Sequence, residues 1–264
     1  MNEFIVGDFR TVLPTLPERS YALILTSPPY NVGLDYGSEI TDYVDRMHWR
    51  DYWRLLDDFM KAAKRLLVEG GRVAVNLPGY AVGKRPGYAH HHYMGEIARE
   101  LGYTLLTEII WDQGVSGHRT AWGSFASPSA PRFPSTHEFI EVFCVEPKRK
   151  DRKGRGDITN AEFSEWSSPI WHISGRQRGE RPGSFPEAIP DRLIRLFTWQ
   201  GDGVLDPFAG CGTTGTVARR LKRRYTLIDV VPRCKEMFEA LLEGEPLCSQ
   251  VASPRLMARP SPTT

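Results

Sequence analysis

The sequence predicts an α/β fold with a mostly parallel, Rossmann-like sheet, on the strength of three observations. Short apolar runs alternate along the chain with longer stretches in which apolar residues recur at helical spacing, the pattern of repeated βα units. The run at 21–26, Tyr-Ala-Leu-Ile-Leu-Thr, is almost continuously apolar, as in a parallel strand buried on both faces. A glycine-rich turn at 206–215 separates a short apolar run from a helical pattern, which places it at a strand-to-helix connection.

The elements follow in order along the chain. Strands are expected at residues 4–6, 21–26, 72–77, 104–111, 139–145, 204–205 and 225–228. Helices are expected at residues 49–67, 93–101, 190–199, 213–221 and 232–242, the first of them ending at a glycine stop, Glu69-Gly70-Gly71. One strand and one helix follow the glycine-rich turn, so the other strands must come from the N-terminal part of the chain. The strand order is therefore circularly permuted relative to a dinucleotide-binding fold.

The chain divides into one α/β domain and a small insert. Residues 1–146 and 184–246 form the two halves of the domain. Residues 147–183 form the insert between them, which carries a basic run followed by Trp166 and Trp171. The tail at 247–264 is rich in Pro and Ser and is expected to be disordered.

Composition and charge exclude several classes of protein. The net charge of +2 does not by itself indicate a partner. Four cysteines without a Cys-x-x-Cys pair match neither a zinc site nor a disulfide framework, so a reducing compartment is expected. The N-terminus lacks the apolar segment of a signal peptide, and no apolar run approaches the roughly 20 residues of a membrane helix, so we expect a cytoplasmic protein. The His triplet at 90–92 lacks supporting carboxylates, and no metal is expected.

The glycine-rich turn indicates a ligand site. Gly210, Gly212 and Gly215 match a dinucleotide fingerprint, and Asp229 follows at about the distance of a ribose ligand, so a nicotinamide or flavin enzyme is one interpretation. Asp206, at the strand end, favours another. A carboxylate there would repel a pyrophosphate but suits a cationic ligand, such as the ammonium or sulfonium of S-adenosylmethionine.

A second motif, Ser27-Pro28-Pro29-Tyr30, directly follows the buried strand at 21–26. Ligands of open α/β sheets bind beyond the carboxyl ends of the strands, where this turn falls. Two prolines remove two N–H donors, which leaves carbonyl acceptors to dominate the turn. Acceptors beside an aromatic ring suit a flipped base, because they can take its amino hydrogens while Tyr30 stacks on the ring.

These motifs, in this order, resemble the amino-methylating DNA methyltransferases of the permuted β-class, over roughly residues 4–242. The segments that carry the resemblance are 7–8, 26–30, 69–77, 122–124, 136–140, 184–199 and 205–215, together with Asp229. Cys211 departs mildly from the family, which often has Ser or Ala there. The resemblance implies an S-adenosylmethionine-dependent methyltransferase fold in which residues 1–146 are the catalytic half, 184–246 the cofactor-binding half and 147–183 a target-recognition insert.

The resemblance also implies which residues act. Ser27, Pro28, Pro29 and Tyr30 form the catalytic segment. The expected ligands of S-adenosylmethionine are Asp8, Thr26, Ser184, Phe185, Asp206, Phe208, Gly210, Gly212, Thr213, Thr214 and Asp229.

Cytosine N4 is the expected target atom in double-stranded DNA. Both cytosine and adenine present an amino group beside a ring acceptor, so hydrogen bonding cannot separate them. The choice rests on the resemblance, since Ser in the first position of the turn is typical of the cytosine branch and Asp of the adenine branch. Adenine N6 stays open as an alternative, and RNA as a more distant one. Cys211 lies in the glycine-rich turn, not in a catalytic loop after proline, which argues against methylation at cytosine C5.

The insert is the expected DNA contact, because its basic run lies between sheet strands and is followed by Trp166, Trp171 and three arginines. From Lys148 to Arg155 it carries six basic residues and one acidic residue. The expected DNA ligands are Lys148, Arg149, Lys150, Arg152, Lys153, Arg155, Arg176 and Arg178. Two further partners are left open: a cognate restriction endonuclease, which the resemblance raises, and a second copy of the chain.

Overall fold

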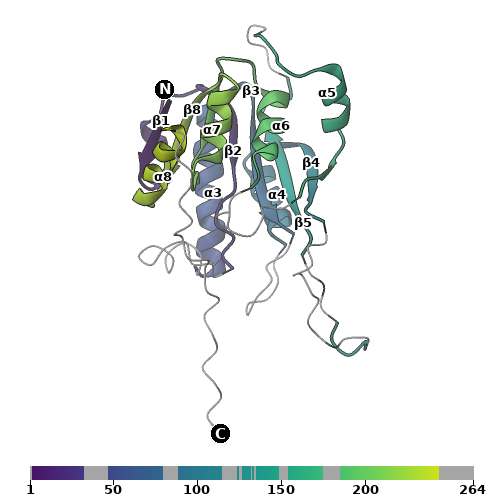
Figure 1. Ribbon diagram of the computed structural model, residues 1–264. Coiled ribbons are helices and arrows are strands. Elements are labelled where there is room, and N and C mark those ends of the chain that lie inside the picture. Colours follow the sequence, from purple (N-terminus) through teal and green to yellow (C-terminus); the bar gives the residue numbers. More distant parts are fainter. Residues whose placement is uncertain are drawn as a thin grey trace.

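The computed structural model describes residues 2–32, 47–79, 89–114, 124, 127–131, 133, 135–148, 154–174 and 185–243, and within them the chain folds around one eight-stranded sheet (Figure 1). The strands are β1 (Asn2–Val6), β2 (Tyr21–Thr26), β3 (Leu67–Pro78), β4 (Thr104–Asp112), β5 (His137–Cys144), β6 (Ile170–His172), β7 (Gly203–Asp206) and β8 (Arg224–Asp229). Their order across the sheet is β1-β8-β7-β2-β3-β5-β4-β6. Neighbouring strands are parallel except at β5, which runs antiparallel to both β3 and β4.

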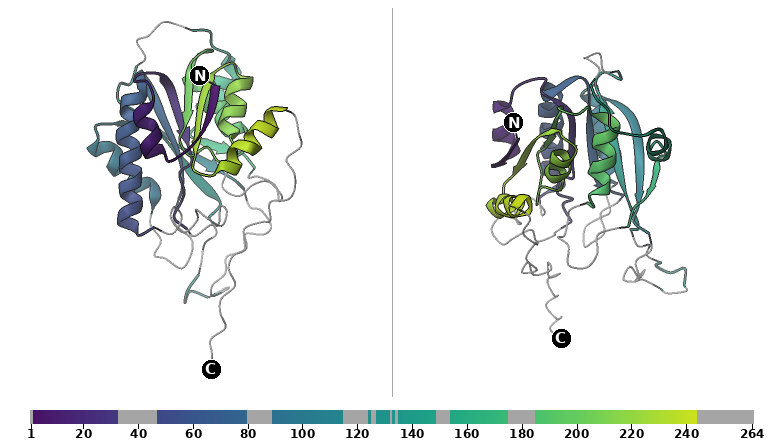
Figure 2. Two further views of the ribbon diagram at one scale, coloured as in Figure 1. Left: turned by 90° about the vertical axis from the view of Figure 1, so that its left-hand side faces the viewer. Right: turned by 45° about the horizontal axis from the view of Figure 1, so that its top comes forward.

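Helices cover both faces of this sheet. They are α1 (Phe9–Val12), continued by a 3₁₀ turn at Leu13–Thr15, α3 (Trp49–Leu66), α4 (His90–Glu100), α5 (Asn160–Trp166), α6 (Ala188–Phe197), α7 (Thr213–Arg220) and α8 (Pro232–Glu243). Figure 2 shows the sheet with α3 on one side and α6 and α7 on the other. None of the helices in the described ranges is long and apolar enough to cross a membrane.

Side-chain alternation along the strands builds two separate cores. Ile24 of β2 faces α3 and belongs to a cluster with Tyr52, Phe59 and Met94. Leu23 and Leu25, one residue to either side, face α6 and α7 instead, in a second cluster. Successive side chains of a strand point to opposite faces, so a central strand buried on both sides must be apolar throughout. This is the reason for the uninterrupted apolar run of β2.

The direction of the chain changes between β2 and β7. From β7 the chain passes through α7 to β8, on one side, whereas from β2 it passes through α3 to β3, on the other. β2 and β7 are themselves paired, Leu23 with Val204 and Ile24 with Leu205. Connections that diverge from two adjacent strands leave a crevice at their carboxyl ends, where α/β proteins bind ligands. The predicted permuted, mostly parallel α/β fold is confirmed. The Ser-Pro-Pro-Tyr turn follows β2 and the glycine-rich turn follows β7, so both turns lie at this switch point.

Some expected boundaries were wrong. Gly70 and Gly71 were expected to end a helix, but they lie inside a strand. α3 ends at Leu66, and β3 begins at the next residue. Tyr21 pairs with Leu67 and Leu23 with Arg72, so the glycines form a bulge within β3, with Gly70 at a φ of 69°. The helix expected at 93–101 begins earlier, at the His triplet, and α5 and β6 were not expected at all.

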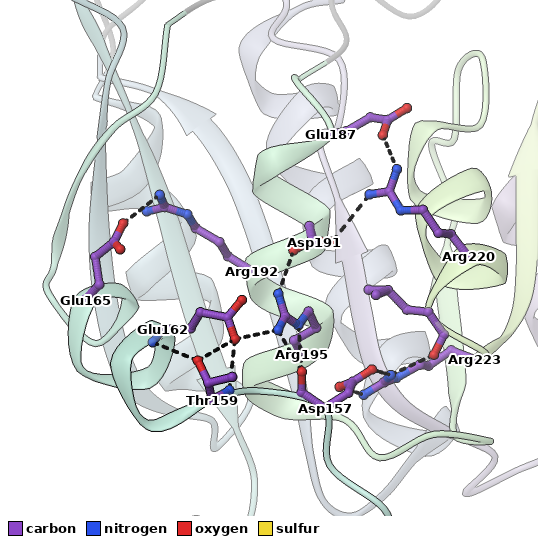
Figure 3. A network of polar contacts seen from close by, with 11 residues as sticks. Asp157, Thr159, Glu162, Glu165, Glu187, Asp191, Arg192, Arg195, Arg220 and Arg223 are labelled. Carbon is purple, nitrogen blue, oxygen red and sulfur yellow. Dashed lines mark hydrogen bonds and ion pairs between the residues drawn. The ribbon is translucent and has the colours of Figure 1, made fainter.

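The described part of the insert joins the sheet through β6, which pairs with β4, and through an ionic network with α6 and with Arg223, between α7 and β8 (Figure 3). Arg223, buried, binds both carboxylate oxygens of Asp157. Arg195 of α6 binds Glu162 of α5 at 2.6 Å. Hydrogen bonds from the Thr159 backbone, from Arg195 and from the Thr159 hydroxyl lower the pKa of Glu162 to about 2. The division of the chain at 147 and 183 stays a prediction.

Trp166 and Trp171 are core residues. Their exposed fractions are 9% and 1%, and the Trp171 indole N–H donates to the Trp166 carbonyl oxygen at 3.0 Å. The guanidinium of Arg192 lies over both rings, 5.5 and 5.2 Å from their centroids. Part of the expectation that the insert contacts DNA rested on these tryptophans, and that support is removed.

Glu141 of β5 generates a prediction about stability. Its side chain is buried against α4 near Gly95, and Glu108 of β4 is its partner in the strand pairing. Burial, and to a smaller extent the charge of Glu108, raise the pKa of Glu141 from 4.5 to about 8. The folded chain therefore holds this proton more tightly than the unfolded chain, and stability falls as pH rises from 4.5 towards 8. Glu141→Gln should remove that loss, raising the free energy of unfolding by on the order of 1–3 kcal/mol at pH 8 and by little near pH 5. Urea unfolding at both pH values checks this, and equal changes at the two would contradict it.

Candidate active site at the carboxyl edge of the sheet

The glycine-rich turn after β7 is shaped by its glycines and by β8. Gly212 precedes α7 with a φ of 81°, and a Cβ on it would lie 2.3 Å from Phe238 of α8. The Gly210 N–H donates to the Asp229 carboxylate at 2.8 Å, and the Ala209 N–H to the Ile228 carbonyl oxygen at 2.9 Å. The turn is thereby fixed against the end of β8, and only glycine fits at 212 without displacing the Phe238 ring.

Asp206 joins this turn to the end of β2. Its carboxylate is buried and accepts hydrogen bonds from the Thr26 hydroxyl at 2.7 Å, the Thr214 hydroxyl at 2.6 Å and the Phe208 N–H at 3.2 Å. Burial raises its pKa to about 6, although these three hydrogen bonds oppose the shift. Residues 180 positions apart in sequence are thus tied together at the switch point. A buried carboxylate with this pKa is poised to accept a cation, whose charge would stabilise the ionised form.

The ends of β8 and β1 carry two further predicted ligands. Asp229 accepts from Gly210 and from the Val231 N–H at 2.9 Å, and burial raises its pKa. The Gly7 N–H donates to the Asp229 carbonyl oxygen at 2.9 Å, which brings the two strand ends together. Asp8 caps α1 and forms an ion pair with Arg10. The side-chain hydrogen bond from Arg10 lowers the pKa of Asp8.

The Ser-Pro-Pro-Tyr turn is held on two sides. The Nε2–H of His90, a buried residue of α4, donates to the Tyr30 carbonyl oxygen at 2.8 Å, so α4 fixes the end of the turn. On the other side, the Tyr30 hydroxyl lies 2.9 Å from Ser27 Oγ and donates to Glu138 Oε2 at 2.8 Å. Asn76 Nδ2 reaches both Tyr30 Oη, at 2.8 Å, and Glu138, at 2.6 Å.

Glu138, Asn76 and Gln113 are site residues that sequence reasoning missed. Gln113 follows β4 and donates to Glu138 Oε1 at 2.7 Å. A signal for them exists in the strand alternation. Each lies two residues along its strand from a member of the α6-facing cluster: Trp111 before Gln113, Ala74 before Asn76 and Ile140 after Glu138. Polar residues at or just beyond the end of a buried row of side chains mark a site, once the strand pairing is known.

Three more of the predicted cofactor ligands, Phe185, Phe208 and Thr213, lie in the described residues. Phe185 is buried among the residues packed on α6, and Phe208 packs against Phe9, with ring centroids 5.0 Å apart. Thr213 is the first residue of α7, and Ser184 falls outside the described residues. The structure therefore brings together Thr26, Asp206, Phe208, Gly210, Gly212, Thr214 and Asp229, and places Ser27 and Tyr30 next to Thr26.

The basic run lies differently. Because β5 is antiparallel, it delivers Lys148 to the opposite edge of the sheet. There Arg72, the first residue of β3 that pairs with β5, donates to the Pro147 carbonyl oxygen at 2.8 Å. The Arg155 carbonyl oxygen accepts from Gln200, just before β7 begins. Arg149, Lys150, Arg152, Lys153, Arg176 and Arg178 fall outside the described residues. The two ends of the run that the structure describes are thus away from Ser27, and DNA binding by these residues stays a prediction.

Comparison with known proteins now adds to this geometry. A family model described as DNA methylase, N6_N4_Mtase, matches residues 21–240 and so spans both turns. The chain belongs to this DNA methylase family. The methylase is 38% identical over 180 residues to the Type II methyltransferase M.MjaVI of Methanocaldococcus jannaschii, covering 67% of this chain and 87% of that protein. The predicted family is confirmed.

Solved structures support the same conclusion for the fold of the methylase. TTHA0409 of Thermus thermophilus, solved in complex with S-adenosyl-L-methionine, is 28% identical, with a TM-score of 0.73 and coverage of 93% of this chain and 95% of that one. The PvuII DNA methyltransferase, described as cytosine-N4-specific, has a TM-score of 0.68 over 92% of this chain and 93% of its own. At 19% identity, that likeness shows the fold alone.

The two left-handed glycines of the turn give a matched pair of variants. Gly210→Ala places a Cβ in open space and meets only the backbone penalty, about 1–2 kcal/mol. Gly212→Ala meets the same penalty and also drives a Cβ into the Phe238 ring, adding about 1–3 kcal/mol. Urea unfolding should therefore show a larger loss of stability for Gly212→Ala. Equal losses would contradict the close packing of the turn on α8.

Proposed function

We propose that this methylase transfers a methyl group from S-adenosylmethionine to the exocyclic N4 of cytosine in duplex DNA, with the target base flipped out of the helix. The observation that carries the proposal is the Thr26–Asp206 hydrogen bond. It holds an acidic, glycine-rich turn directly beside a turn rich in acceptors, so a methyl donor at one and an amino group at the other would lie next to each other. Close placement of two reactants is itself a large part of catalysis.

The residues at the glycine-rich turn fit S-adenosylmethionine, which supplies an electrophilic methyl group when bound. Asp206 would face the cationic methionine part, because its carboxylate uses three hydrogen bonds and retains acceptor capacity. Asp229, held at the end of β8, would face the ribose. The Asp206 carboxylate would repel the pyrophosphate of a nicotinamide or flavin dinucleotide, the competing interpretation of the glycine pattern.

At the other turn, Ser27 Oγ and the Pro28 carbonyl oxygen would accept the hydrogens of the amino group. This favours a pyramidal nitrogen whose lone pair attacks the methyl group in line, and no covalent bond to the enzyme is needed. Cys211 is buried within the glycine-rich turn, 3.7 Å from the Thr213 hydroxyl, in keeping with direct transfer. Pro28 and Pro29 keep the turn rigid, and the Tyr30 ring would stack on the base.

Ser27 carries the choice of cytosine, and adenine N6 is the alternative. An uncharged hydroxyl in the first position of the turn, together with the resemblance of this segment to the cytosine branch, supports N4. The proposal includes duplex DNA as the partner. The Type II designation of M.MjaVI is consistent with a cognate restriction endonuclease as a second partner.

The cofactor proposal predicts a pH dependence. Asp206 has a pKa of about 6 without ligand, and a bound cation would lower it. Below pH 6 the ligand must therefore displace a proton, and its affinity should fall by up to about tenfold per pH unit. Calorimetric titration with S-adenosylmethionine between pH 5 and 8 measures this.

Asp229 also has a raised pKa, so Asp206→Asn serves as the control. This variant should bind more weakly at pH 7.5 and lose most of the dependence near pH 6. A wild-type affinity that is flat across the range, or a dependence that survives in the variant, would contradict the role of Asp206.

The choice of base is tested by the product. Wild-type methylase, incubated with S-adenosylmethionine and duplex DNA, should give N4-methylcytosine in nucleosides analysed by mass spectrometry. Ser27→Ala should slow single-turnover transfer about a hundredfold, which is the usual effect of removing one placed polar group. Its affinity for the cofactor should not change. N6-methyladenine as the product would refute the choice of base, and transfer by Ser27→Ala at the wild-type rate would refute the assigned turn.

A further inference from the structure

A chain of hydrogen bonds connects the catalytic turn to a carboxylate on another strand. Ser27 Oγ lies 2.9 Å from Tyr30 Oη, and Tyr30 Oη lies 2.8 Å from Glu138 Oε2. Glu138 is itself held by two amides, Asn76 at Oε2 and Gln113 at Oε1. Four strands thus contribute to one polar cluster at the carboxyl edge of the sheet.

The direction of each hydrogen bond in this chain follows from counting protons. The Tyr30 hydroxyl has a single proton, and it donates that proton to Glu138 Oε2. Asn76 Nδ2 also donates to Tyr30 Oη, so in that hydrogen bond the Tyr30 oxygen is the acceptor. The remaining contact, between Ser27 Oγ and Tyr30 Oη, must then have Ser27 as the donor. Its own proton is turned towards Tyr30, and the lone pairs of Ser27 Oγ are left for another donor.

This direction matters for the reaction proposed above. A serine hydroxyl free to rotate could point its hydrogen at an incoming amino group, which would set two donors against each other. A hydroxyl whose proton is already given to Tyr30 offers only lone pairs. Preorganised groups of this kind need no rearrangement in the transition state, which is where placed polar groups contribute most.

We propose that Glu138 is a positioning residue for methyl transfer: acting through Tyr30, it orients the Ser27 hydroxyl as an acceptor for the amino group of the target base. Asn76 and Gln113 hold the Glu138 carboxylate in place, and chains of hydrogen bonds strengthen one another when every member is satisfied. The inference rests on the proposed function, since it assigns to Ser27 the amino group of a base.

The test uses single-turnover methyl transfer with saturating cofactor and DNA. Glu138→Gln keeps the shape of the side chain but brings an amide donor to Tyr30, so the proton order of the chain is lost. Tyr30→Phe keeps the stacking ring but removes the link. Each should slow transfer by roughly tenfold to a hundredfold, while the affinity for S-adenosylmethionine stays at the wild-type value, because the glycine-rich turn is untouched.

The decisive comparison is made in the Ser27→Ala background. If Glu138 acts through Tyr30 on Ser27, neither Glu138→Gln nor Tyr30→Phe should slow Ser27→Ala further, because coupled residues are not additive. Glu141→Gln is the matched control: the same substitution, three residues along β5, on the opposite face of the sheet. It should leave the transfer rate unchanged.

Two outcomes would overturn the inference. One is a wild-type transfer rate in Glu138→Gln. The other is that Glu138→Gln slows transfer as much in the Ser27→Ala background as it does in the wild-type protein. Both differ from failure of the proposed function, in which the wild-type protein itself transfers no methyl group to DNA. Thermal unfolding of each variant separates a loss of folded protein from a loss of rate.

Discussion

The Asp206 carboxylate is buried at the switch point between β2 and β7. It accepts hydrogen bonds from Thr26 at the end of β2 and from Thr214 in α7. A charge in this position is costly unless it is bonded on several sides, and burial has raised its pKa accordingly. The two turns that carry the chemistry are therefore not independent: each supplies part of what the other needs to keep its shape. In the proposed reaction, the cofactor and the base are placed relative to each other by this one group.

Around this point, the fold consists of two cores that share a sheet. Strand alternation sends one row of side chains to α3 and α4 and the next to α6 and α7, and the functional residues are the polar ends of these rows. Glu138, Asn76 and Gln113 end rows on the α6 face, where Ser27 also lies, whereas His90 supports Tyr30 from the α4 face. The catalytic turn is thus fixed from both layers, as rigid positioning requires.

Much of this was predictable from the sequence, and the reasons for the exceptions are physical. The continuous apolar run of β2 and the spacing of the glycines reflect local requirements, so the elements at the switch point were predicted. Pairing is not local. The antiparallel course of β5 could not be inferred from residues 137–144, yet it brings Glu138 to the active edge and Lys148 to the opposite one. Likewise, Gly70 and Gly71 have the composition of a helix stop, but their bulge arises from pairing with β2.

The central claim is that the amino group of a cytosine lies between Ser27 and a methyl donor bound at Asp206. A crystal structure of the methylase with S-adenosylhomocysteine and duplex DNA tests it most directly. We expect a cytosine flipped out of the helix, with its N4 at hydrogen-bond distance, about 2.7–3.2 Å, from Ser27 Oγ and facing the cofactor sulfur. A target base seated away from Ser27, or a cofactor bound away from Asp206, would contradict the account.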